Sequence, residues 1–155
     1  MKDSAHQLPL LSGSAFSVSQ AEDYLRDSVI PLRLACNDRG GFPLVAAHWY
    51  YYDQGYLWCV LHGESRVAQR LAEDGRCAFE IAGDKPPYLG VRGQGDAALL
   101  EGQAGPLLEK LLDRYLGRRD TRLGQWLLGR KDQELVLRIQ PRWVTTWDYR
   151  QRMAG

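Results

Sequence analysis

The chain has 155 residues, of which 45% are hydrophobic, so it is long enough for one domain with a sizeable core and too apolar for a disordered protein. Its 20 basic and 19 acidic residues leave a formal net charge of +1, which argues against nucleic-acid binding driven by bulk charge. No apolar run approaches the length that a membrane-spanning helix needs.

The N-terminal segment carries no visible targeting signal. Its first residues lack the basic-then-apolar layout of a signal peptide, so we expect a cytoplasmic protein that does not act at a membrane. Residues 1–17, which include Pro9 and Gly13, are interpreted as an N-terminal arm. Residues 18–155 are interpreted as a single domain.

The first half of this domain is predicted to contain one short helix and three strands. Ser19 and Glu22 have the spacing of a capping box, which predicts a helix that runs through Leu25. Turn residues at 37–41 and 53–55 separate the apolar runs that follow, and their spacing indicates an antiparallel meander. The predicted strands cover residues 30–36, 43–52 and 56–61.

The second half alternates helices with longer strands. Ser65 stands at the N-cap of a predicted helix that ends near residue 74. Glycines 90, 93 and 95 interrupt a long apolar run, which indicates a bulge or the close approach of another backbone or a ligand. The remaining predicted elements are strands over 76–81 and 88–100, a loop over 83–87, helices over 107–115 and 122–128, and a last strand over 134–139 and 143–147 interrupted by Pro141.

The fold class follows from this order of elements. About six clustered and locally antiparallel strands, with three or four helices, suit a mainly β fold better than a parallel doubly wound sheet. We therefore expect a small antiparallel β-barrel with helices at its edges.

A candidate anion site lies at the helix that Ser65 begins. A helix start offers free backbone N–H groups and the positive end of the helix dipole, and Arg66 adds a planar guanidinium fork. Arg70 lies on the same helix face as Arg66, four residues later. The alternative interpretation is an ordinary capped surface helix with a solvated arginine.

The three cysteines, Cys36, Cys59 and Cys77, are interpreted as buried reduced thiols because each lies in an apolar, strand-like run. A zinc site built from Cys59, His62 and His48 is an alternative. Residues 59 and 62 point to opposite faces of a continuous strand and no fourth ligand is evident, so we expect no metal site.

The order of motifs resembles that of the FMN-binding split-barrel proteins, the pyridoxamine 5'-phosphate oxidase-like superfamily, over residues 26–148. The resemblance rests on four features in chain order: a turn and Pro43 leading to His48-Trp49-Tyr50, a hairpin leading to residues 56–61, Ser65-Arg66 at a helix start, and the glycine-containing run 91–97. It implies that the fold, mainly β with flanking helices, is a six-stranded antiparallel split β-barrel, and it implies an FMN cofactor and a homodimer with flavin sites at its interface.

The resemblance also implies roles for individual residues. Ser65 and Arg66 match the pair that holds the FMN phosphate. The backbone of Ala46, Ala47, His48 and Trp49 would follow the flavin ring, with Leu61 and His62 beside the ribityl phosphate.

Val67, Ala46 and Tyr51 depart from the basic residues of true pyridoxamine phosphate oxidases. A general flavin-dependent reductase is therefore expected rather than a vitamin B6 oxidase. A histidine at position 62 resembles the nitroimidazole-reductase-like branch.

The function expected from the sequence is that of an FMN-dependent oxidoreductase acting on a small organic substrate. The alternatives are a non-catalytic flavin- or haem-binding carrier or stress protein and a deazaflavin-dependent reductase. His48 is either a proton-transfer group beside the flavin or a partly buried strand histidine. The sequence names neither the substrate nor the electron donor, and specificity is expected in the loop at 85–87, the helices between 105 and 128, and the C-terminal tail.

Overall fold

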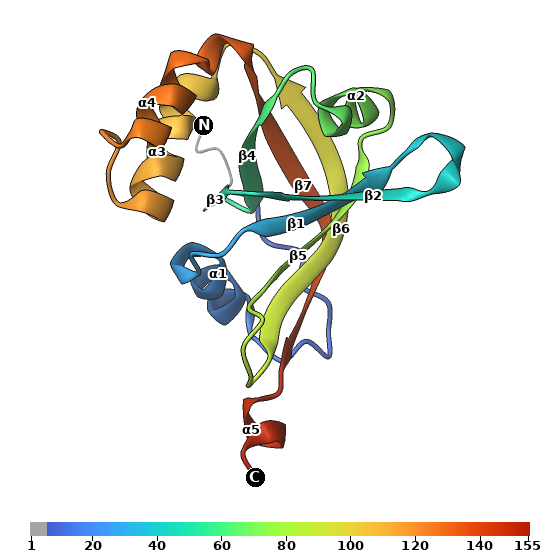
Figure 1. Cartoon of the computed structure of the whole chain (residues 1–155). Coiled ribbons are helices and arrows are strands. Elements are labelled where there is room, and N and C mark those ends of the chain that lie inside the picture. The colour runs from blue at the N-terminus through green and yellow to red at the C-terminus, as the bar shows by residue number, and fades with distance from the viewer. Residues whose placement is uncertain (1–5) are drawn as a thin grey trace, which may run out of the picture.

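Seven antiparallel strands form one curled sheet in the computed structural model, which describes residues 6–155 (Figure 1). The strand order across the sheet is β2-β1-β5-β6-β7-β4-β3. The strands are β1 (Leu32–Asn37), β2 (Pro43–His48), β3 (Tyr50–Asp53), β4 (Tyr56–His62), β5 (Arg76–Ala82), β6 (Leu89–Leu100) and β7 (Glu134–Asp148). The expected class, mainly β with flanking helices, is confirmed.

The helices lie around the rim of this sheet. Figure 1 shows α3 and α4 side by side at one end, with the short α5 at the opposite end near the C-terminus. The helical elements are α1 (Val18–Asp27), η1 (Arg39–Gly41), α2 (Arg66–Glu73), α3 (Ala104–Leu116), α4 (Arg122–Gly129), η2 (Lys131–Gln133) and α5 (Arg150–Met153). None of the helices within residues 6–155 is long and apolar enough to cross a membrane.

The expected number of six strands is wrong because the predicted strand over 43–52 is broken at Trp49. Its first half, β2, pairs with β1, and its second half, β3, pairs with β4. The meander pairing is therefore as expected. The break places the two halves at opposite edges of the sheet, and because one bent segment supplies both edges, the sheet curls toward a barrel.

The two longest strands, β6 and β7, form the spine of the sheet. Their register shifts between Gln94 and Gly95, where Gly95 faces Pro141. Since proline has no N–H to donate, the expected interruption of the last strand takes the form of a bulge inside a continuous strand. The prediction that the glycines mark a close backbone approach is confirmed, because a Cβ on Gly93 would meet the carbonyl oxygen of Trp143.

The helix starts were predicted with mixed success. The helix beginning after Ser65 is confirmed, with the Ser65 hydroxyl accepting the backbone N–H of Ala68 at 3.2 Å. The first helix begins earlier than expected, because its capping box is formed by Ser17 and Gln20 rather than by Ser19 and Glu22. The sequence analysis did not predict α5.

The core fills the inside of the curled sheet. In β1 and β4 every second residue is buried, as expected for strands with one face on a core. Leu8 and Phe16 are also buried in this core, so the described part of the predicted arm, residues 6–17, packs on the domain. Residues 1–5 of that arm lie outside the described residues.

Candidate functional site

A groove of about 590 Å³ runs between the edge strand β2, strand β4 and helices α3 and α4. We call it the β2–α4 groove. It brings together seven of the eight residues that the sequence analysis singled out: Ala46, Ala47, His48, Trp49, Leu61, His62 and Ser65. Its volume lies within the usual range for small-molecule sites.

Helix α2 supplies a polar end to the groove. Its N-cap, Ser65, and its second residue, Val67, line the groove. The Ser65 side chain and carbonyl take the N–H groups of Ala68 and Gln69. Within residues 6–155 the N–H groups of Arg66 and Val67 have no acceptor, which leaves two donors at the positive end of the helix.

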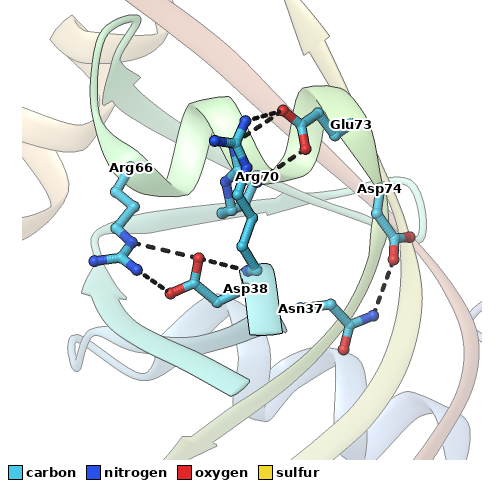
Figure 2. Close-up of polar contacts among 7 residues, drawn as sticks. Asn37, Asp38, Arg66, Arg70, Glu73 and Asp74 are labelled. Atoms are coloured by element: carbon cyan, nitrogen blue, oxygen red, sulfur yellow. Dashed lines mark hydrogen bonds and ion pairs between the residues drawn. The ribbon is translucent and has the colours of Figure 1, made fainter. Parts of the chain in front are cut away.

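The eighth predicted residue, Arg66, does not line this groove. Its guanidinium forks onto Asp38, with Nη2 2.5 Å from Oδ2 and Nε 3.4 Å from Oδ1 (Figure 2). It borders a separate shallow hollow shared with Arg39, Glu64 and Arg70. Ser65 and Arg66 thus border different hollows. Of the two residues expected to hold the phosphate, only Ser65 lines the β2–α4 groove.

The neighbouring arginines are also paired. Glu73 accepts from Arg39 at 2.8 Å and from both terminal nitrogens of Arg70 at 2.8 and 3.0 Å (Figure 2). Arg70, which is 6% exposed, is buried under this contact. The pKa of Asp38 is lowered, mainly by the backbone N–H of Arg39 and further by the Arg66 guanidinium.

His48 forms part of the groove wall at the end of β2. Its Nε2 atom is enclosed and has no hydrogen-bond partner within the described residues. Burial lowers the pKa of the imidazole, so the neutral ring is favoured.

His62 lies at the end of β4 and is held by two neighbours. Its Nδ1 accepts the backbone N–H of Glu64 at 3.1 Å, and its Nε2 is 3.4 Å from Oε1 of Gln133. These contacts favour the tautomer that carries the proton on Nε2. His62 therefore presents a fixed ring at the polar end of the groove.

The opposite wall of the groove is apolar and was not assigned from the sequence. It comes from α3 and α4, the region in which specificity was expected. Trp126 is 57% exposed and Leu123 is 45% exposed, although both are large and hydrophobic. The apolar lining residues of this wall are Leu108, Leu111, Leu123, Trp126 and Leu127. The sequence did carry a signal for this wall, namely the large apolar residues Leu123, Trp126 and Leu127 in a short predicted helix. A helix that only covers the surface does not need so many apolar side chains.

A paired charge borders this apolar wall. Arg130 lies over the ring of Trp126, 4.5 Å from its centroid, and its Nε is 2.9 Å from Oε1 of Glu134. Glu134 is almost fully buried. Arg130 and Glu134 themselves line the groove, so the ion pair and the Trp126 ring form one part of its wall.

None of the three cysteines lines the β2–α4 groove. All three are buried and unbridged, which confirms the interpretation of reduced thiols. Burial raises the pKa of the Cys77 thiol to about 12 and raises that of Cys59 further. No cluster of three potential metal ligands is found within residues 6–155.

The groove suits a flat aromatic cofactor with an anionic tail. Strand β2 is an edge strand, so part of its backbone N–H and C=O groups lacks a strand partner. A flavin ring needs such donors and acceptors between apolar walls, and its phosphate needs N–H donors like those of Arg66 and Val67. The residues therefore fit FMN, except that the Arg66 side chain is engaged elsewhere.

Comparison with known proteins finds similarity in structure alone, because no family model and no curated protein matches the sequence. A conserved hypothetical protein from Mycobacterium tuberculosis aligns with a TM-score of 0.76 and 23% identity, over 94% of this chain and 93% of that one. An F420 reductase aligns at 0.64 and 21%, over 79% and 94%.

A candidate pyridoxamine 5'-phosphate oxidase from Listeria innocua aligns at 0.60 and 16%, over 83% of this chain and 98% of that one. The haem storage protein HutZ from Vibrio cholerae and an FAD-binding protein from Mesorhizobium loti align at TM-scores of 0.63 and 0.62. The chain thus shares its fold with these structures, which include a candidate pyridoxamine 5'-phosphate oxidase, and this confirms the resemblance at the level of the fold.

Proposed function

We propose that the chain binds FMN in the β2–α4 groove and acts as a flavin-dependent oxidoreductase on a small organic substrate. The observation that carries this proposal is the groove itself, which joins the edge of β2, the start of α2 and the apolar wall of α4. FAD-binding, F420-reducing and oxidase-like proteins with this fold support it.

In this proposal each part of the groove has one task. The N–H groups of Arg66 and Val67 and the hydroxyl of Ser65 hold the phosphate. The backbone from Ala46 on β2 to Trp49, the residue after it, follows the edge of the ring, and Leu61 and His62 lie beside the ribityl phosphate. Bound FMN supplies the one- or two-electron chemistry, and the protein supplies orientation and access.

The α4 wall lies across the groove from β2, so in this proposal it borders the flavin ring as well as the substrate space. Leu123, Trp126 and Leu127 offer an apolar surface that includes a partly exposed indole ring, which suits a planar and largely apolar substrate. The neutral imidazole of His48 lines the groove and is able to carry a proton.

The experiment is a visible spectrum of the purified protein after incubation with FMN and desalting. We expect retained flavin near one per subunit. Leu123→Glu places a carboxylate in the groove and should weaken FMN binding at least about tenfold. Gln125→Glu adds the same charge to α4 at an exposed position that does not line the groove, and should bind FMN like the original chain. A protein that takes up no FMN, or equal binding by both variants, contradicts the proposal.

A homodimer with the flavin sites at its interface is part of the proposal. Phe42, in the turn between β1 and β2, and Val45, on β2, support it, because they are 75% and 64% exposed although both are hydrophobic. Light scattering after size exclusion tests it directly. A monomer that retains FMN would remove the dimer from the proposal and leave the cofactor.

Haem binding without turnover is the second candidate function. Two histidines, His48 and His62, line the groove and are able to act as axial ligands, and a haem storage protein has the same fold. The same spectroscopic titration, made with haemin, separates the two candidates. A Soret band that shifts on binding, together with no uptake of FMN, favours haem. Competition between FMN and a deazaflavin tests the third alternative, a deazaflavin-dependent reductase.

A further inference from the structure

The ion pair between Arg66 and Asp38 joins the start of α2 to the turn after β1 (Figure 2). The two members of the pair differ in exposure. The Asp38 side chain is 12% exposed, whereas that of Arg66 is 68% exposed. The carboxylate is therefore the fixed member and the guanidinium is the member that is free to turn.

Asp38 is fixed because the turn itself holds it. Its Oδ1 accepts the backbone N–H of Arg39 at 2.9 Å, and its own N–H donates to the carbonyl of Phe42. The carboxylate is thus the cap of η1 as well as the partner of Arg66. Its lowered pKa keeps it ionised at neutral pH.

Arg66 is the arginine of this cluster that belongs to the first turn of α2, and its side chain is 68% exposed. Arg70 is buried beneath Glu73, and Arg39 shares that same carboxylate. Arg66 is the first residue of α2, so its side chain begins beside the two N–H groups that have no acceptor. A phosphate on those N–H groups would attract the Arg66 guanidinium away from Asp38.

We infer that Asp38 is an internal counter-anion that competes with the flavin phosphate for Arg66, and so sets how strongly the groove prefers FMN to riboflavin. This inference rests on the proposed function. In the original chain the phosphate gains the helix start and Ser65, but gains Arg66 only by breaking its contact with Asp38. The fixed carboxylate also repels a dianionic phosphate at short range.

The test compares the dissociation constants of FMN and riboflavin, measured by quenching of flavin fluorescence. Asp38→Asn removes the charge and keeps a side-chain oxygen that caps η1, and Asp38→Ser offers a second neutral cap if the first variant folds poorly. Each should bind FMN about three- to tenfold more tightly while leaving riboflavin unchanged.

Two controls isolate the mechanism. Asp148→Asn removes a similar carboxylate, which accepts the Arg150 backbone N–H and pairs with the Arg150 side chain. Asp148 is the last residue of β7, directly before α5, and α5 lies at the opposite end of the sheet from α2 (Figure 1). It should leave both affinities unchanged. Arg66→Ala, added to Asp38→Asn, should abolish the gain for FMN.

The outcomes separate the inference from the proposed function. A tighter FMN complex that depends on Arg66 supports the inference. If the original chain binds FMN and neither Asp38 variant alters the ratio of FMN to riboflavin affinity, the inference is wrong and the cofactor stands. If neither flavin binds to any variant, both the proposed function and the inference are wrong.

Discussion

The hydroxyl of Tyr115 accepts the backbone N–H of Tyr50 at 3.2 Å, at the junction between β2 and β3. The same hydroxyl donates to the carbonyl of Ile30 at 2.9 Å, and the Tyr115 ring stacks on Trp49 with centroids 5.0 Å apart. Helix α3 thereby supplies the hydrogen-bond acceptor for the backbone N–H of Tyr50 at the strand break. It also fixes Trp49, which the proposed function puts beside the flavin ring.

Tyr115→Phe should destabilise the fold by about 1–2 kcal/mol, because the N–H of the buried residue Tyr50 loses its acceptor. The free energy of unfolding from urea titration measures this effect. Tyr88→Phe is the control, since the Tyr88 side chain is 42% exposed and its hydroxyl makes no hydrogen bond within the described residues. Equal stability of the two variants would show that the hydroxyl of Tyr115 does not hold the junction.

Arg114 makes a second link from α3, to the C-terminal end of α1. Its guanidinium donates to the carbonyls of Leu25, Arg26 and Ser28 and lies 5.0 Å from the ring centroid of Tyr50. Positive charge at a helix C-terminus satisfies its free carbonyls.

Arg114→Met keeps much of the apolar stem and should cost about 2–3 kcal/mol, because three carbonyls lose a charged donor. Arg118→Met removes an exposed arginine that pairs with Asp120 and should cost less than about 0.5 kcal/mol. Thermal unfolding of both variants distinguishes a capping role from a general effect of lost charge. Similar losses in the two variants would contradict the capping role.

The sequence analysis predicted the β framework well because that part of the fold depends on local patterns. Alternating apolar residues, turn residues and the Ser65 cap specify strands and a helix start without help from distant contacts. The break at Trp49 was missed for a different reason. It depends on the Tyr115 hydroxyl, which is 65 residues away in sequence and leaves no mark on the pattern of residues 43–52.

The candidate site was predictable to a similar extent. The resemblance supplied positions on β2, β4 and α2, and the groove gathers seven of them. The engagement of Arg66 by Asp38 was not predictable, because their separation of 28 residues is closed only when the turn after β1 meets α2. The wall from Trp126 was missed because α4 has no counterpart among the motifs that carried the resemblance.

His48 should make stability depend on pH. Burial lowers the pKa of its imidazole in the folded chain, while the unfolded chain keeps a value near 6.5. Between these two values the unfolded state binds more protons, so stability falls as the pH decreases below about 6.5. His48→Gln should reduce this dependence. Melting temperatures from pH 8 to pH 5 test it, with the values at pH 8, where both side chains are neutral, as the reference. Parallel curves for the two proteins would contradict the prediction.

Gly93 is required by the close approach of β6 to its neighbours. A Cβ at this position would meet the carbonyl oxygen of Trp143 on β7 and would lie 2.8 Å from the Phe79 ring on β5. Because the Trp143 oxygen belongs to the backbone of a paired strand, it yields only if the ladder shifts. Gly93→Ala should therefore lower the free energy of unfolding by about 1–3 kcal/mol.

Gly83→Ala is the matched control, since a Cβ there meets open space in a loop. It should leave the free energy of unfolding unchanged within about 0.5 kcal/mol. Equal stability of Gly93→Ala and Gly83→Ala would contradict the prediction, because it would mean that β6 and β7 can move apart at Gly93 without a measurable loss of stability.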